Sequence, residues 1–255
     1  MDKTSRSAIT NRFESLRFAD FERMAQDPAL SAHEKIGFPD SYREDFEAAI
    51  YADIASKLPK LAQRGLNVLE IGPGCAGLPR MLMADCAQRG HALVLVDSAA
   101  MLAQLPDAPG VTKVVGFYPE CRAALAPWAG RFDVILCYSV FHYIFVEASF
   151  WRFIDCSLEL LAPGGQMLIG DIPNVSKRKR YFSSLAGVRF HQQFMQTIDE
   201  PAVDFVAVES DKIDDAVILG VVMRARAQGC DAYWLPQADS LPMANRREDI
   251  VILKP

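Results

Sequence analysis

Short apolar runs alternate with helical stretches after Gly65, and this alternation predicts a parallel sheet built from β-α units. The runs are almost continuously apolar, as strands covered by helices on both faces require. Between the last two runs, residues 147–161 place apolar side chains on one helical face, and this helix is expected to end at Pro163-Gly164-Gly165. The expected strands are residues 67–71, 92–97, 113–115, 132–137 and 166–171.

Residues 1–60 have a different pattern and are expected to form an N-terminal helical extension. In residues 7–26 apolar side chains recur at helical spacing, and Asp27-Pro28 ends the run. A second helix is expected from Ser41 to about Lys57, because residues 41–44 have the form of a capping box. The apolar positions of the first helix are Phe13, Leu16, Phe21 and Met24.

The C-terminal third returns to sheet-forming sequence after an interruption. Residues 174–195 are polar and basic and are interpreted as helix or loop, within a substrate-side insertion spanning residues 174–215. A helix is expected at residues 216–226, followed by strands at residues 231–235 and 249–253. These two strands could pair as an antiparallel hairpin.

Composition narrows the class of protein. The chain has 255 residues, of which 51% are hydrophobic, and a formal net charge of -5. These values favour one folded domain and disfavour a nucleic-acid partner. The longest apolar stretch, residues 132–146, is too short to span a bilayer, and the N-terminal ten residues lack the apolar core of a secretory signal. We therefore expect a cytoplasmic protein with no membrane partner. Cysteine and histidine spacings suggest no metal site.

The segment that carries chemical information is the glycine-rich turn after the first strand. Gly72, Gly74 and Gly77 let the backbone approach a ligand closely where a strand ends and a helix begins. Asp97 ends the next strand, 20 residues past Gly77, where a carboxylate can accept both hydroxyls of a ribose. The pattern predicts a ligand that contains adenosine.

Two cofactors fit this pattern. A nicotinamide dinucleotide would place its pyrophosphate on the N–H groups of the turn, but Pro73 removes one donor and Glu70 adds a carboxylate beside it. S-adenosylmethionine has no phosphate and carries an ammonium group that Glu70 could face. The sequence therefore favours S-adenosylmethionine, with a NAD-dependent oxidoreductase as the alternative and a non-catalytic binding module as a third class.

Four segments in order resemble the class I S-adenosylmethionine-dependent methyltransferases. They are the Glu70–Gly77 turn, Asp97, the strand from Phe132 to Ser139, and Leu161-Ala162-Pro163-Gly164-Gly165 with the strand that follows. The resemblance covers roughly residues 61–175. It implies an α/β, doubly wound, mostly parallel seven-stranded sheet of order 3-2-1-4-5-7-6 with the last strand antiparallel. The methyltransferase domain would then span residues 61–255.

The cofactor contacts that follow from this resemblance extend past the turn. The family often has an acidic residue after its third strand to bind adenine, whereas this chain has Phe117 and Tyr118, so we expect adenine to stack on one of these rings. Ser139, at the end of the fourth strand, is expected to contact the cofactor as well.

Candidate catalytic groups follow strands four and five. His142 could remove a proton from the methyl acceptor, and Asp171 is an alternative base. Tyr143 lies where the acceptor would meet the sulfonium. Residues 36–43 could close over the cofactor as a lid that contributes Tyr42 or Arg43 to substrate binding, or could simply join two helices.

Basic side chains suggest a small anionic acceptor. The run at residues 177–180 and the pair at residues 246–247 could anchor a carboxylate or phosphate, with His191 a weaker base candidate. Residues 170–174, 177–180 and 242–249 resemble bacterial methyltransferases of surface-sugar pathways, including acidic nine-carbon sugars. This resemblance implies a sugar-like acceptor. A homodimer is a separate expectation. The anchors expected are Lys177, Arg180, Arg246 and Arg247.

Overall fold

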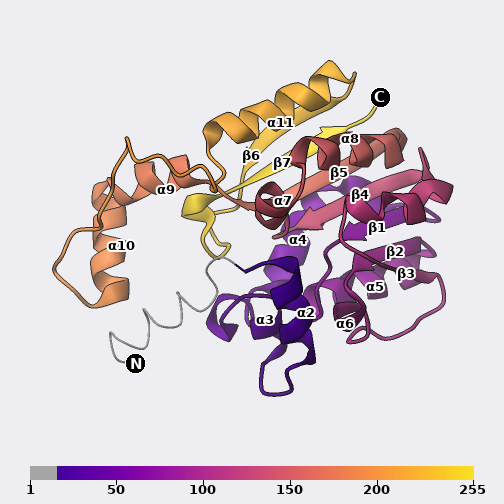
Figure 1. Ribbon diagram of the computed structural model, residues 1–255, viewed down its shortest axis with the longest axis horizontal. Coiled ribbons are helices and arrows are strands. Elements are labelled where there is room, and N and C mark those ends of the chain that lie inside the picture. The colour runs from indigo at the N-terminus through magenta and orange to yellow at the C-terminus, as the bar shows by residue number, and fades with distance from the viewer. Residues whose placement is uncertain (1–15) are drawn as a thin grey trace.

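A seven-stranded sheet forms the centre of the computed structural model, which describes residues 16–255 (Figure 1). The strand order is β3-β2-β1-β4-β5-β7-β6, as the sequence predicts. β1 to β5 are parallel to one another, and β7 runs antiparallel to both β5 and β6. The strands are β1 Asn67–Ile71, β2 Ala92–Asp97, β3 Val111–Val115, β4 Phe132–Tyr138, β5 Leu161–Pro173, β6 Asp231–Pro236 and β7 Arg247–Leu253.

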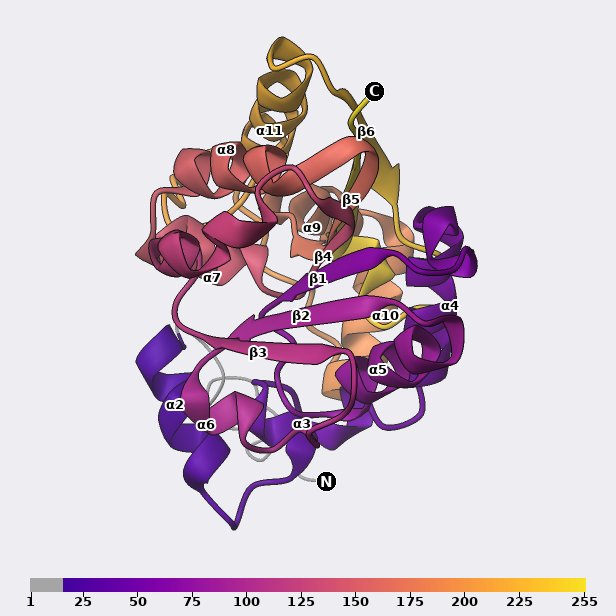
Figure 2. The same ribbon diagram turned by 90° about the vertical axis from the view of Figure 1, so that its right-hand side faces the viewer.

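Helices cover both faces of the sheet, which explains why its strands are apolar on both sides (Figure 2). Side chains of β1 alternate between the two cores, with Leu69 and Ile71 on one side and Val68 on the other. The first face is covered by η3 Glu120–Trp128, α7 Phe141–Glu147, α8 Phe150–Leu160 and α11 Asp215–Ala227. The second is covered by α4 Glu47–Lys57, η2 Pro59–Ala62, α5 Gly77–Arg89 and α6 Ala99–Leu102.

The N-terminal segment lies across the carboxyl ends of the central strands. It comprises α2 Phe18–Gln26, α3 Ala32–Lys35, η1 Asp40–Tyr42 and α4. The predicted start of the second helix at Ser41 was wrong, because residues 40–42 form only a 3-10 turn and α4 begins at Glu47. The chain turns between them, and the side chain of Arg43 is buried. Phe13 lies outside the described residues.

An arm of two helices follows β5. Residues 174–195, interpreted from the sequence as helix or loop, form α9 Val175–Phe182 and α10 Leu185–Met195 beside the body of the domain (Figure 1). The helix predicted over residues 147–161 is confirmed as α8, which begins at Phe150 because Ser149 caps it and ends at Leu160, ahead of the predicted stop at Pro163. The predicted C-terminal hairpin is confirmed by the antiparallel pairing of β6 with β7. Within the described residues, no helix is long and apolar enough to cross a membrane.

Candidate active site

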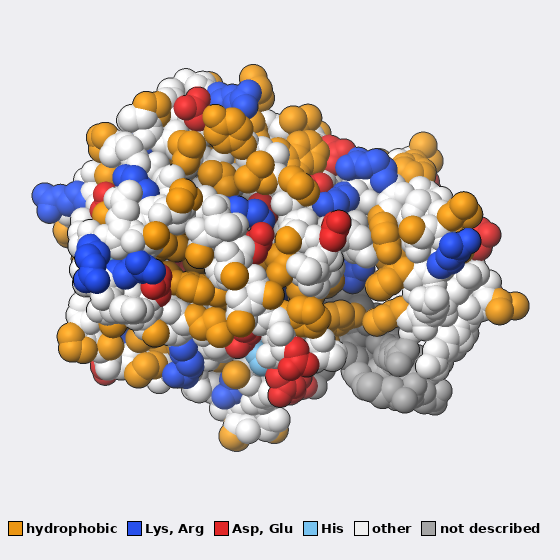
Figure 3. Space-filling view, turned by 180° about the vertical axis from the view of Figure 1, so that it is seen from behind, with side chains coloured by type: hydrophobic (Ala, Val, Ile, Leu, Met, Phe, Trp, Pro, Cys, Tyr) orange, Lys and Arg blue, Asp and Glu red, His pale blue; other side chains and the backbone are white. Residues whose placement is uncertain are grey.

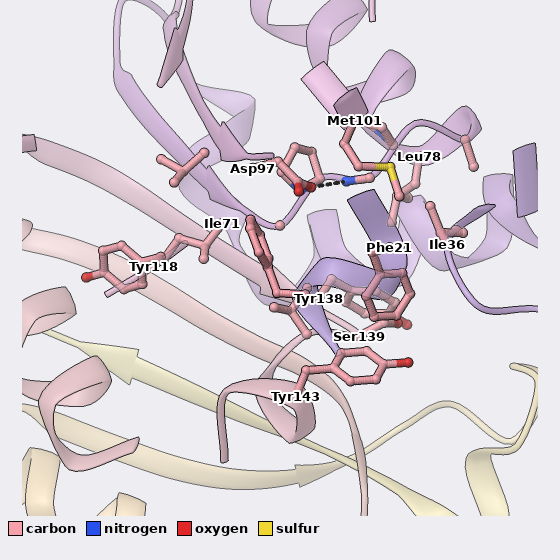
Figure 4. A pocket seen from close by; sticks show the side chains of 18 of the residues that line it. Phe21, Ile36, Ile71, Leu78, Asp97, Met101, Tyr118, Tyr138, Ser139 and Tyr143 are labelled. Carbon is pink, nitrogen blue, oxygen red and sulfur yellow. Dashed lines mark hydrogen bonds between the residues drawn. The ribbon is translucent and has the colours of Figure 1, made fainter. Parts of the chain in front are cut away.

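A cleft opens at the carboxyl ends of β1, β2 and β4, where open α/β sheets bind their ligands. Counted with the open space at its mouth, it holds about 980 Å³. Figure 4 shows Asp97 beside the glycine turn at one end, and Ser139 and Tyr143 at the other. Among the predicted cofactor contacts, those that line the cleft are Gly72, Gly74, Asp97, Phe117, Tyr118 and Ser139.

The glycine turn needs residues without side chains at two positions. Gly72 and Gly74 have φ values of +69° and +67°, in the left-handed region that glycine adopts without strain. A Cβ at Gly72 would lie 2.6 Å from Val140, and one at Gly74 would lie 2.6 Å from Ile36. The turn is therefore packed between Val140, just after β4, and Ile36 of the N-terminal segment, and both glycines line the cleft.

Two carboxyl groups, the buried Glu70 and the partly buried Asp97, lie at this end of the sheet with no basic partner in the described structure. Asp97 accepts hydrogen bonds from the N–H groups of Ser98 and Gly74, at 2.7 and 3.0 Å. Burial raises the pKa of Asp97 to about 6. Burial, and then the nearby charge of Asp97, raise the pKa of Glu70 to about 8. Among residues 16–255, Oε2 of Glu70 has no hydrogen-bond partner. A cation bound beside Glu70 would favour its ionised form.

The N-terminus of α5 is occupied by a carboxylate that the sequence analysis missed. Glu47, from α4, accepts a hydrogen bond of 2.8 Å from the N–H of Gly77. His33 and then Asp40 continue this chain of contacts, at 3.1 and 2.9 Å. A dinucleotide would place its pyrophosphate at such a helix N-terminus. Because Glu47 already supplies the negative charge, the turn suits a ligand without phosphate there.

Aromatic rings from the N-terminal segment close the sides of the cleft. Phe18 packs on Phe117 with ring centroids 5.0 Å apart, and Phe21 meets Tyr143 edge-on at 4.8 Å. Tyr118 is only 3% exposed, and its hydroxyl bonds to Ser157 in the core. Both residues line the cleft, but the ring of Tyr118 points away from the other labelled side chains (Figure 4). Phe117, whose ring packs on Phe18 of the cleft lining, is therefore the better placed of the two rings to stack on adenine.

A buried ionic network joins the N-terminal segment to the ends of β4 and β5. Arg43 donates to Ser139 and to Asp171, each at 2.8 Å, and Ser139 also bonds to Asp171. Arg247 contacts the other carboxylate oxygen of Asp171 at 3.7 Å. Ser139 and Asp171 both have positive φ, a strained conformation for residues with side chains. The network holds this strained pair of strand ends in place.

The same contacts decide the protonation of Asp171. Burial alone would raise its pKa, but the charges of Arg247 and Arg43 and the hydrogen bonds from Ser139 and Arg43 outweigh burial and lower the pKa. The Asp171 carboxylate is therefore an ionised tether for Arg43 rather than an unoccupied base.

We expect Arg43→Met to release the N-terminal segment from the strand ends. Losing one partner of a buried ion pair should lower the free energy of unfolding by about 2 kcal/mol, because Arg247 still faces Asp171. The dissociation rate of S-adenosylmethionine should rise as the cleft loses this wall. Urea unfolding and stopped-flow displacement measure the two effects. Arg23→Met, at an exposed position in the same segment, is the matched control and should change neither.

A second and larger cavity lies between the body and the α9–α10 arm. Counted in the same way it holds about 2,550 Å³, and Figure 3 shows hydrophobic side chains along the hollow beside the arm. Phe38 and Tyr143 line both cavities, so the two adjoin. The predicted substrate or catalytic residues that line the second cavity are Tyr42, His142, Tyr143, His191, Arg246 and Arg247.

His142, which lines this cavity, has an unpaired ring nitrogen among the described residues. Its Nδ1 atom is buried and has no hydrogen-bond partner in the described structure. Burial, and then the charge of Arg247, lower its pKa to about 3. The imidazole is therefore neutral near pH 7, which is the form that a general base needs, but the same burial makes it a weak proton acceptor.

The basic run of α9 divides by helix face. Lys177 pairs with Glu248 at 3.3 Å, and Arg180 bonds to Asp215. Neither of these two predicted anchors is among the described residues that line the second cavity. Arg178, which the prediction did not single out, lines it instead. The Arg178 and Arg246 guanidinium carbons lie 5.8 and 5.9 Å from the centre of the Phe182 ring. Neither forms an ion pair within residues 16–255.

Comparison with known proteins agrees with this geometry. Residues 42–204 match the family model described as a methyltransferase domain. No curated protein sequence matches the chain. One similar solved structure is a chain from the complex of the Haloferax volcanii methyltransferase activator Trm112 with a methyltransferase. It has 15% identity and a TM-score of 0.57, and the match covers 94% of this chain and 100% of that one.

Two further structures extend the comparison. The Haemonchus contortus phosphoethanolamine N-methyltransferase 1, solved with phosphoethanolamine and S-adenosylhomocysteine, has 12% identity and a TM-score of 0.59, covering 98% of this chain and 50% of that one. The CurJ carbon methyltransferase has 17% identity and a TM-score of 0.54, and the match covers 96% of this chain and 66% of that one. At these identities the likeness establishes the fold.

The chain belongs to the methyltransferase domain family, because the family model matches well over half of its residues. It is a class I S-adenosylmethionine-dependent methyltransferase, and S-adenosylmethionine is its cofactor. The family match thus decides against the nicotinamide alternative, in agreement with the carboxylate at the N-terminus of α5.

Proposed function

We propose that this enzyme methylates an oxygen or nitrogen of a small anionic acceptor bound in the second cavity. The observation that carries the proposal is a pair of guanidinium groups, Arg178 and Arg246, without acidic partners in the described structure and facing a cavity that adjoins the cofactor cleft. Guanidinium groups suit carboxylates and phosphates. The α9–α10 arm, predicted as a substrate-side insertion, would form one wall of the acceptor site.

Groups at this end of the sheet would match each part of S-adenosylmethionine: Asp97 and Phe117 line the cleft, whereas Glu70 is buried near the end of β1, outside the cleft lining. Glu70, with an unsatisfied buried oxygen, would face the ammonium group, and Asp97 would exchange its bond to Gly74 for the ribose hydroxyls. Phe117 would provide the surface for adenine. S-adenosylmethionine supplies a methyl group whose bond to sulfur breaks, leaving the electron pair on sulfur, as the acceptor atom forms the new bond to carbon.

The residues of the chain then position the acceptor and handle its proton. Tyr143, which lines both cavities, would lie where acceptor and methyl group meet. His142 would take the proton that the acceptor loses, because its Nδ1 is unpaired and its imidazole is neutral. The N-terminal segment would exclude water from this junction.

Transfer assays test the proposal. We expect S-adenosylmethionine and S-adenosylhomocysteine to bind, NAD to fail to bind, and S-adenosylhomocysteine to be released in the presence of hydroxylated or aminated anions, including the acidic sugars expected from the sequence. Neutral analogues of the same acceptors should be methylated at least about tenfold less efficiently, as expected for losing a charged hydrogen bond. Equal turnover of neutral and anionic analogues would contradict the anionic acceptor.

A further inference from the structure

The second cavity has features that specify more than a negative charge. We propose, building on the function above, that the acceptor is an aromatic organic anion, whose carboxylate or phosphate lies between Arg178 and Arg246 and whose planar ring packs against the aromatic side chains of the arm.

Aromatic rings form the arm side of the cavity. The ring of Phe182 lies within 6.0 Å of both guanidinium groups and 6.2 Å from the ring of Phe190. Phe190 stacks in turn on Phe194, with an interplanar angle of 9°. All three line the cavity. An apolar surface of aromatic rings therefore begins beside the two cations, which fits an anion attached to a ring.

Three polar side chains that could bind sugar hydroxyls, those of Asn174, Glu209 and Asp211, are already occupied. The oxygen of Asn174 accepts from the N–H groups of Ser176 and Lys177, and its nitrogen donates to Asp215. Two carboxylates line the cavity, and both are paired: Glu209 with Lys179 at 2.8 Å and Asp211 with Lys212 at 3.4 Å. A hydroxyl-rich acceptor would have to compete for these groups.

Arg246 is a cation with few competing contacts. Within residues 16–255, its side chain donates one hydrogen bond, a long one of 3.4 Å to the neighbouring Asn245. Burial, and then the charge of Arg247, lower the pKa of Arg246. A bound anion would relieve this repulsion, whereas Arg247 is already committed to Asp171.

Binding of matched naphthalene ligands tests the inference on the intact protein saturated with S-adenosylhomocysteine. Ligand-observed NMR or calorimetry would compare naphthoate, naphthyl phosphate, neutral naphthamide and an acidic nine-carbon sugar. We expect one or both naphthyl anions to bind about tenfold or more tightly than the amide and the sugar. The stronger of the two distinguishes a carboxylate site from a phosphate site.

Substitutions make the test specific to the residues. Arg246→Met and Arg178→Met should each weaken naphthyl anions about tenfold or more while leaving naphthamide unchanged. Phe182→Leu should weaken all three naphthyl ligands. Arg224→Gln, in an exposed ion pair on α11, is the control. Tighter binding of the sugar acid, absence of binding by both naphthyl anions, or unaltered binding in Arg246→Met would overturn the inference. Cofactor binding measured in the same samples reports separately on the methyltransferase site.

Discussion

Replacing Glu70 with Gln is expected to stabilise the protein without cofactor and to weaken its binding of S-adenosylmethionine. The pKa of Glu70 is raised to about 8 in the folded protein, from 4.5. When folding raises the pKa of a carboxyl group, the protonated group stabilises the folded state. This stabilisation is complete below the pKa of the unfolded state and is lost as the pH rises through the pKa of the folded state. Wild-type stability should therefore fall between about pH 5 and pH 8, and Glu70→Gln should not share this loss.

The magnitude of this effect is large. The difference in unfolding free energy between variant and wild type should grow by roughly 1.4 kcal/mol per pH unit across that window. Chemical unfolding at several pH values measures it, with the exposed Glu120→Gln as control. If the difference in unfolding free energy did not change with pH, Glu70 would already be ionised in the folded protein, stabilised by another partner.

Cofactor binding should change in the opposite direction. Loss of a carboxylate facing the ammonium should weaken S-adenosylmethionine by roughly 1 to 3 kcal/mol. Wild-type protein should also release a proton on binding near neutral pH, since the bound cation favours ionised Glu70, and Glu70→Gln should release less. Calorimetry in buffers of different ionisation enthalpy measures this. A residue with only a structural role would not combine higher stability with weaker binding and lost proton release.

The sheet and the cofactor turn were predictable because local sequence specifies them. Apolar runs bounded by glycine and proline define strands without knowledge of the neighbours, and the spacing from Gly72 to Asp97 follows from one β-α-β unit. Glu47 could not be found in this way. It reaches Gly77 from a different helix, and nothing near residue 47 indicates that contact.

The acceptor side was harder for a related reason. Four consecutive basic residues look equivalent in the sequence, but Lys177, Lys179 and Arg180 are paired with acidic residues from distant segments. One local signal was available. Arg178 and Phe182 are four residues apart and therefore share a helix face, so the helical phase of α9 would have selected Arg178.

His142→Gln is expected to abolish most turnover while leaving cofactor affinity unchanged. His142 lines the acceptor cavity and not the cofactor cleft, so removing its imidazole should affect proton removal alone. Loss of a general base typically costs about 10²- to 10⁴-fold in rate. The effect should appear in kcat, with little change in the KM for S-adenosylmethionine.

The pH dependence separates a base from a structural role. Once the imidazole is gone, the acceptor must lose its own proton before reaction, so activity of His142→Gln should climb about tenfold per pH unit towards the acceptor's own pKa. Wild-type activity should stay nearly level, because the pKa of His142, about 3, leaves the imidazole neutral throughout. Asp171→Asn is the informative comparison. Because this variant weakens the ion pair with Arg43, it should unfold more easily and release the cofactor faster. Its activity should not rise with pH in the way expected for His142→Gln. A climb in Asp171→Asn and none in His142→Gln would reassign the base.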